Sequence, residues 1–124
     1  MDGLNQLIDQ VGPSIAALKT HVDLVDDWTS ERWDEFCRTA KGFDLLVFED
    51  RKFADIGGIS RKQMAGVYNI RQWADLVTAH LISGPDLGDG LQAGWRDAGR
   101  AGGALLLAQM SSRGNLLQPD YPSQ

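Results

Sequence analysis

The chain has 124 residues, which suits one domain large enough to bury a core. Apolar residues make up 43% and charged residues 23%, values that argue against a disordered or fibrous protein. The net charge of −5 argues against a nucleic-acid partner, because neutralising phosphates requires a basic surface.

The single cysteine, Cys37, excludes an internal disulfide and favours a reducing, cytoplasmic setting. No signal-like segment and no apolar run long enough to span a bilayer is visible, so we expect no membrane partner.

Helices are predicted from apolar residues that recur with helical spacing and from the residues that end each run. Gly12 with Pro13 and, later, Gly42 are typical helix stops. Ser60 followed by Gln63 resembles a capping box at a helix start. The predicted helices cover residues 1–11, 31–41, 60–68 and 87–98, the last one diluted by glycines.

Short apolar runs between these helices predict strands at residues 15–18, 45–48, 74–79 and 104–108, followed by a loop over 113–124. A strand therefore recurs about every thirty residues with a helix between, the rhythm of βα units around a parallel sheet. No internal repeat or linker divides the chain, so one α/β domain over residues 1–124 is expected.

Polar side chains follow each predicted strand, where working groups collect in parallel α/β folds. They are Lys19, His21, Asp23, Asp50, Lys52, Asp55, His80 and Ser111. Both lysines with Asp50 and Asp55 would form a network of alternating charge, which is strongest in a pocket poor in water. A lysine among carboxylates can deliver a proton to a carbon where negative charge develops.

The same residues also have purely structural interpretations. Lys19 suits a surface position, either histidine suits a packing role, Asp23 suits a turn cap and Ser111 suits a loop start. The four tryptophans are expected in the core or in helix packing. The histidines and the cysteine lack the spacing of metal ligands, so no metal is expected.

Residues 48–57 read Phe-Glu-Asp-Arg-Lys-Phe-Ala-Asp-Ile-Gly, which closely resembles the signature of orotidine 5'-phosphate decarboxylase in its fungal and animal form. Residues 18–23, 73–80 and 107–112 resemble that family's second, fourth and fifth strand segments, and 112–116 the start of its lid loop. The resemblance covers almost the whole chain and implies part of a TIM (β/α)8 barrel, about four βα units with parallel strands.

The resemblance also implies an activity, the conversion of orotidine 5'-phosphate to UMP and CO2 in pyrimidine synthesis without a cofactor or metal. Lys52 corresponds to the proton donor for the pyrimidine carbon that loses CO2, and Asp50 to the carboxylate facing the substrate carboxylate. Lys19 corresponds to the lysine that links the ribose to the charge network.

Further substrate contacts are implied for Thr20 and His21, and for Ser111 at the pyrimidine ring. Asp55 corresponds to an aspartate that reaches the partner subunit's site, so a homodimer with shared active sites is implied. Ile59 replaces the family's threonine at the same partner contact, although Ser60 offers a neighbouring hydroxyl.

Two further departures concern the end and the length of the chain. Tyr121-Pro122 stands where the family has an aromatic-threonine pair. A full barrel takes about 250 residues, so the first strand with its aspartate and the last three strands with the phosphate-binding glutamine and arginine are expected to be missing. We therefore expect a fragment with impaired activity and exposed sheet edges.

Two alternatives stay open from the sequence. One is a truncated or degenerate, non-catalytic paralogue that acts at most as a dimerising half-barrel, which Ile59 and the missing ends favour. The other is a related sugar-phosphate decarboxylase, because a similar Asp-x-Lys cluster occurs there.

Overall fold

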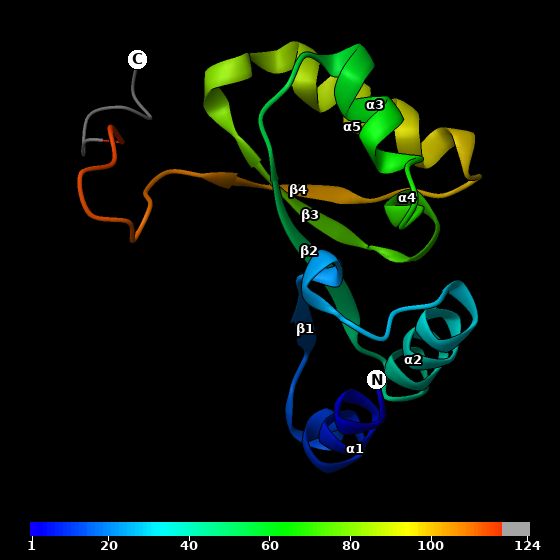
Figure 1. Ribbon diagram of the computed structural model, residues 1–124. Coiled ribbons are helices and arrows are strands. Elements are labelled where there is room, and N and C mark those ends of the chain that lie inside the picture. The colour runs from blue at the N-terminus through cyan, green and yellow to red at the C-terminus, as the bar shows by residue number, and fades with distance from the viewer. Residues whose placement is uncertain (118–124) are drawn as a thin grey trace.

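The computed structural model describes residues 1–117 and contains one parallel sheet of four strands (Figure 1). The strands are β1 (Ala17–Thr20), β2 (Leu46–Phe53), β3 (Leu76–His80) and β4 (Gly103–Leu107), adjacent in that order. Each neighbouring pair is parallel, so the carboxyl ends of all four strands meet at one edge. The predicted α/β class with parallel strands is confirmed.

The helices pack as two pairs along the sheet. The elements are α1 (Asp2–Val11), α2 (Ser30–Gly42), α3 (Gly57–Met64), the single turn α4 (Ile70–Trp73) and α5 (Pro85–Asp97). Short 3-10 turns lie at Gly12–Ser14, Val22–Leu24 and Leu81–Ser83. In Figure 1, α1 and α2 lie together near β1 and β2, whereas α3 and α5 lie side by side near β3 and β4.

Alternation along the strands separates a covered face from an open one. Val47 and Val77 are fully buried, whereas Leu46 is 49% exposed and Leu105 43% exposed on the other face. Three of the four tryptophans are buried as expected, and Trp28 packs edge-on against Tyr68 with ring centroids 5.1 Å apart. One face of the sheet therefore builds the core and the other stays open, as in a section of barrel wall.

The glycines that weaken the predicted helix at 87–98 have a packing role. A Cβ atom at Gly90 would overlap the backbone of Gly57, and one at Gly94 would lie 3.1 Å from Cβ of Met64. Small residues here let α5 approach α3 closely, so packing offsets the low helix propensity of glycine.

The first two strands end later in the structure than the sequence predicted. β2 continues to Phe53, so Asp50 and Lys52 lie inside the strand rather than after it. β1 covers Ala17–Thr20 instead of residues 15–18, and its later end places Lys19 within the strand. Both strands continue into charged residues, because one face of each strand end is open to a pocket and does not pack against the core.

The third helix was also misplaced. It begins at Gly57 and ends at Met64, and Ser60 is not its cap, because the Ser60 hydroxyl donates to the Asp55 carbonyl at 3.2 Å. The one-turn helix α4 was not predicted; it follows Asn69, which takes a left-handed φ of 43°.

Residues 113–117 form no helix or strand, in line with the predicted loop. The rest of that loop, with the Tyr121-Pro122 departure, lies outside the described residues. None of the described helices combines the length and the apolar character needed to cross a membrane.

Candidate active site

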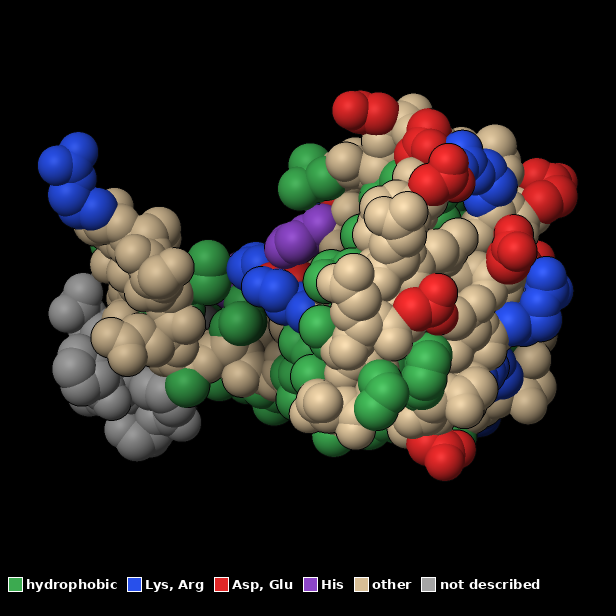
Figure 2. All heavy atoms as spheres, turned by 90° about the horizontal axis from the view of Figure 1, so that it is seen from below, with side chains coloured by type: hydrophobic (Ala, Val, Ile, Leu, Met, Phe, Trp, Pro, Cys, Tyr) green, Lys and Arg blue, Asp and Glu red, His purple; other side chains and the backbone are tan. Residues whose placement is uncertain are grey.

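An open pocket of about 470 Å³ lies at the carboxyl edge of the sheet. Figure 2 shows basic, acidic and histidine side chains gathered around a hollow beside the C-terminal segment. The lining draws on all four strand ends, and its members are Lys19, His21, Phe48, Asp50, Lys52, Thr78, Leu107, Gln109, Met110 and Ser111.

The Asp50 carboxylate is the centre of the polar contacts in this pocket. Its Oδ1 lies 2.7 Å from Lys52 Nζ and accepts a hydrogen bond from the Thr78 hydroxyl at 2.8 Å. Its Oδ2 lies 3.4 Å from Lys19 Nζ and 3.4 Å from His21 Nε2. Lys19, His21 and Lys52, all predicted at the site, thus surround the Asp50 carboxylate.

Burial alone would raise the pKa of Asp50. Hydrogen bonds from Lys52 and Thr78 and the charge of Lys52 outweigh that effect and lower the pKa to about 2. The pocket therefore contains a carboxylate that stays ionised at any physiological pH.

The backbone of β2 is irregular at this point. Glu49 pairs with Val77 and Phe53 pairs with Ala79, so residues 50–52 lie opposite Thr78 alone. Such a bulge frees backbone groups from the ladder and is common next to active sites. Lys52 takes a left-handed φ of 53°, and its N–H donates to the Thr78 hydroxyl at 2.8 Å.

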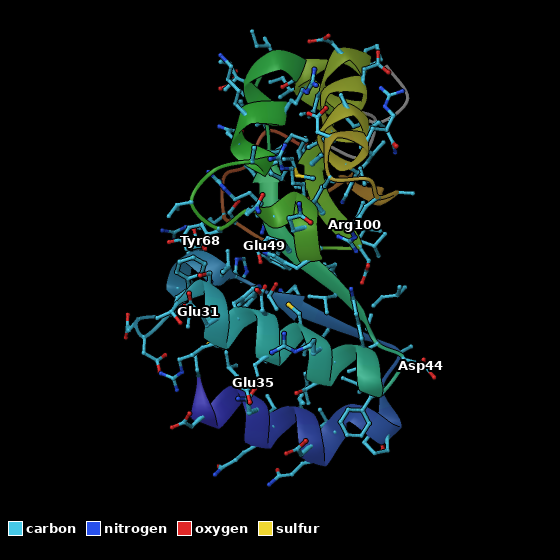
Figure 3. All side chains as sticks on the ribbon, turned by 90° about the vertical axis from the view of Figure 1, so that its right-hand side faces the viewer. Glu31, Glu35, Asp44, Glu49, Tyr68 and Arg100 are labelled. Carbon is cyan, nitrogen blue, oxygen red and sulfur yellow. The ribbon has the colours of Figure 1, made fainter. Side chains whose placement is uncertain are left out.

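Glu49, the neighbour of Asp50 on the opposite face of β2, was not predicted from the sequence. This carboxylate is fully buried and accepts hydrogen bonds from the Thr20 hydroxyl at 2.6 Å and from the Val22 N–H at 3.1 and 3.2 Å. Figure 3 shows Glu49 in the interior, whereas Glu31 lies on α2. Burial raises the pKa of Glu49 to about 7, although both hydrogen bonds oppose the rise. The signal available was the period-two alternation from Val47, which places Glu49 on the covered face.

Not every expected residue reaches the pocket. Thr20 does not line it, since its hydroxyl is bound to Glu49 on the covered face. Asp55 is exposed and its Oδ1 accepts the Ile56 N–H at 2.8 Å; within the described residues it forms no ion pair with a lysine. Of the four residues expected in the charge network, Lys19, Asp50 and Lys52 therefore come together within one chain and Asp55 does not.

Ile59 lies on α3, exposed and outside the pocket lining. The predicted substrate role of Thr20 and the partner contacts of Asp55 and Ile59 stay predictions.

Two other candidates lie elsewhere. His80 lines a separate apolar cavity of about 380 Å³ together with Leu87, Leu91 and Leu106. Asp23 is exposed in the 3-10 turn after β1.

One group among residues 1–117 brings possible metal ligands together, with atoms of His21, Asp23 and Glu49 within 4.8 Å of one another. Both oxygens of Glu49 already accept hydrogen bonds that tie β1 and the following turn to β2. These contacts explain the cluster as part of the fold, and we assign it no metal.

Comparison with known proteins gives curated relatives that are named orotidine 5'-phosphate decarboxylase. The chain is 43% identical over 122 residues to the protein from Rhizomucor pusillus, covering 98% of this chain and 46% of that protein. It is 44% identical over 121 residues to the protein from Maudiozyma exigua, covering 95% and 45% respectively. The chain thus spans less than half the length of these relatives.

A solved structure supports the fold. The crystal structure of orotidine 5'-monophosphate decarboxylase from Methanocaldococcus jannaschii matches with a TM-score of 0.68 and 22% identity, over 95% of this chain and 55% of that one. The four-stranded unit is therefore similar to about half of a larger α/β fold.

The family comparison agrees with the resemblance that residues 48–57 carry. The sequence model described as "Orotidine 5'-phosphate decarboxylase / HUMPS family" matches residues 1–120 of the chain. The chain belongs to the orotidine 5'-phosphate decarboxylase / HUMPS family.

Proposed function

We propose that the pocket is the centre of an orotidine 5'-phosphate decarboxylase, which converts orotidine 5'-phosphate to UMP and CO2. The observation that carries this proposal is the ionised Asp50 carboxylate held between two lysines, 2.7 Å from Lys52 and 3.4 Å from Lys19. The names of the curated relatives support the choice of substrate within the family.

Lys52 supplies the proton in this proposal. The bond between the pyrimidine carbon and the substrate carboxylate breaks, CO2 leaves, and the electron pair stays on the ring carbon. The Lys52 ammonium then donates a proton to that carbon, and solvent returns a proton to the amine. Asp50 stabilises the positive charge on Lys52 before the transfer, because the two groups are in direct contact.

Asp50 also raises the free energy of the bound substrate relative to that of the transition state. A second carboxylate placed against it is repelled, and that repulsion ends when the substrate carboxylate becomes neutral CO2. In this proposal Lys19 binds the ribose, Ser111 contacts the pyrimidine ring and His21 contacts the substrate, and all three residues line the pocket.

We extend the proposal to a homodimer in which a second copy completes the pocket. Asp55 lies next to Ile56, which is 63% exposed, and Ile59 is also exposed on α3. The Ser83 hydroxyl donates a hydrogen bond to the Ala54 carbonyl, next to Asp55 in the chain. This contact brings Ile82, which is 76% exposed, close to Asp55. Exposed apolar side chains around a charged residue suit a protein interface.

A cytoplasmic site of action is also part of the proposal. The thiol of Cys37 is buried, and burial raises its pKa to about 12, so it is an inert packing group. One unpaired thiol suits a reducing compartment.

The test is decarboxylation of orotidine 5'-phosphate by the purified chain and by a hybrid enzyme. In the hybrid enzyme this chain replaces the matching segment of the Rhizomucor pusillus protein, which supplies the remaining part of the relative's length. We expect the hybrid enzyme to form UMP. A folded hybrid enzyme without turnover would contradict the proposal and favour a non-catalytic paralogue.

A further inference from the structure

Thr78 occupies a special position opposite the bulge in β2. Residues 50–52 face this one residue of β3, and its hydroxyl makes two hydrogen bonds there. It donates to Asp50 Oδ1 at 2.8 Å and accepts from the Lys52 N–H at 2.8 Å. Thr78 is only 5% exposed, so water does not compete freely for these contacts.

The donor and the acceptor in each of these two hydrogen bonds are fixed by the chemistry of the partners. A hydroxyl has one proton to donate and two lone pairs that accept. The Lys52 N–H can only donate and the Asp50 carboxylate can only accept, so the hydroxyl proton is directed to Asp50. The left-handed φ of Lys52 is disfavoured for a residue with a side chain, and the bulge removes its N–H from the regular ladder. The Thr78 hydroxyl gives that N–H a partner and so stabilises this backbone shape.

We propose that Thr78 is a positioning residue, which holds the Asp50 carboxylate and the Lys52 backbone in one fixed relation. The inference rests on the proposed function, since it concerns how the decarboxylase centre is assembled. The other groups that face Asp50 are the side chains of Lys52, Lys19 and His21. Among these contacts, the Thr78 hydroxyl is the one that links the Asp50 carboxylate to the backbone of β2, through the Lys52 N–H.

The first test uses the chain alone and needs no substrate. Thr78→Val keeps the shape and removes the hydroxyl, whereas Thr78→Ser keeps the hydroxyl. By carboxyl NMR from neutral pH down to about pH 1, we expect Thr78→Val to raise the pKa of Asp50 by about one unit, a tenfold change in proton affinity. The Lys52 amide should also exchange faster with solvent in Thr78→Val, while Thr78→Ser should resemble the unmodified chain.

Thr39→Val is the matched control, because the Thr39 hydroxyl bonds only the Glu35 carbonyl on α2 among the described contacts. It should leave the pKa of Asp50 and the exchange of the Lys52 amide unchanged. An unchanged pKa of Asp50 in folded Thr78→Val would overturn the proposal. If Thr78→Val does not fold, the unmodified chain still decides, since a Lys52 amide that exchanges as fast as an unstructured one would overturn it as well.

The second test uses the hybrid enzyme. Misplacement of catalytic groups lowers kcat more than it weakens substrate binding, so we expect Thr78→Val to reduce kcat about tenfold or more with little change in KM. Thr78→Ser should restore most of the rate. An inactive unmodified hybrid enzyme would reject the proposed function while the NMR result stands, whereas full activity in Thr78→Val would reject the positioning role alone.

Discussion

Glu49 and Asp50 are consecutive carboxylates on β2 that experience opposite environments. Glu49 points to the covered face, where burial raises its pKa to about 7. Asp50 points to the pocket, where contacts with Lys52 and Thr78 lower its pKa to about 2. The chain thus places a carboxyl that gains a proton readily next to one that never does so at physiological pH.

The difference shows that burial alone does not decide the charge of a carboxyl group. Both side chains lose contact with water, but Glu49 is offered only neutral donors, a hydroxyl and an amide. Asp50 is offered two ammonium groups. Full charges outweigh the cost of desolvation, whereas neutral donors offset only part of it.

Removal of the Lys52 ammonium should have the largest effect on this comparison. In the hybrid enzyme, we expect Lys52→Ala to lower kcat by about a thousandfold or more, because the general acid is lost. In the chain alone the pKa of Asp50 should rise while that of Glu49 should not change. Carboxyl NMR and UMP formation check these outcomes, and the exposed Lys62→Ala on α3 is the control. Turnover that survives Lys52→Ala would contradict the assignment.

A third carboxylate, Asp55, is neither buried like Glu49 nor paired with a lysine like Asp50 within the described residues of one chain. Mixing two kinds of subunit tests its role. Hybrid enzymes with Lys52→Ala and with Asp55→Ala should each be inactive. In a mixed dimer one of the two sites keeps both residues, so random mixing should restore about a quarter of the original activity. Confirmed mixed dimers without any recovery would show that Asp55 does not act across the interface.

Glu49→Gln should change how stability depends on pH. The pKa of Glu49 is higher in the folded chain than its ordinary value of 4.5, so the folded chain binds this proton more tightly. Its contribution to stability is therefore lost as pH rises from about 4.5 to about 7, by roughly 3 kcal/mol at most. Denaturant unfolding at pH 5 and pH 8 should show this loss in the original chain.

Glu49→Gln should lack that loss, since an amide does not titrate. Glu35→Gln, an exposed change on α2, should keep it. The sign is opposite to that for Asp50, whose stabilising effect is lost only below about pH 4 as it becomes protonated. Equal slopes for the original chain and Glu49→Gln would mean that Glu49 is ionised when buried.

The smallest effect is expected at Asp97, whose carboxylate also pairs with a cation. Arg61 donates two hydrogen bonds of 2.6 Å to it, and they lower the pKa of Asp97. This pair lies on the surface, where solvent and salt screen the charges. Asp97→Asn should therefore shift Tm only slightly, and the shift should vanish at high salt. A large, salt-independent shift would show that enclosure matters less than we infer.

The sequence predicted the order of elements and the residues of the charged cluster well. Apolar runs located all four strands, and the polar residues after them located Lys19, Asp50 and Lys52 near one another. This succeeded because parallel strands bring their carboxyl ends to one edge whatever the details of their packing.

Register and local backbone shape were not predictable in the same way. The bulge that places residues 50–52 opposite Thr78 depends on strand pairing, which no single segment encodes. Thr78 itself sits in an ordinary apolar run. Ser60 carries a capping pattern but lies one turn inside α3, because contact between α3 and α5 determines where that helix begins.

The most direct test of the opposite environments of Glu49 and Asp50 is a carboxyl titration of the chain by NMR, with the two groups assigned individually. We expect Glu49 to be protonated and Asp50 to be ionised at pH 5, with Glu49 releasing its proton near pH 7. Two carboxyl groups that titrate together near pH 4 would contradict this, because burial would then not raise the pKa of Glu49 and the contacts with Lys52 and Thr78 would not lower that of Asp50.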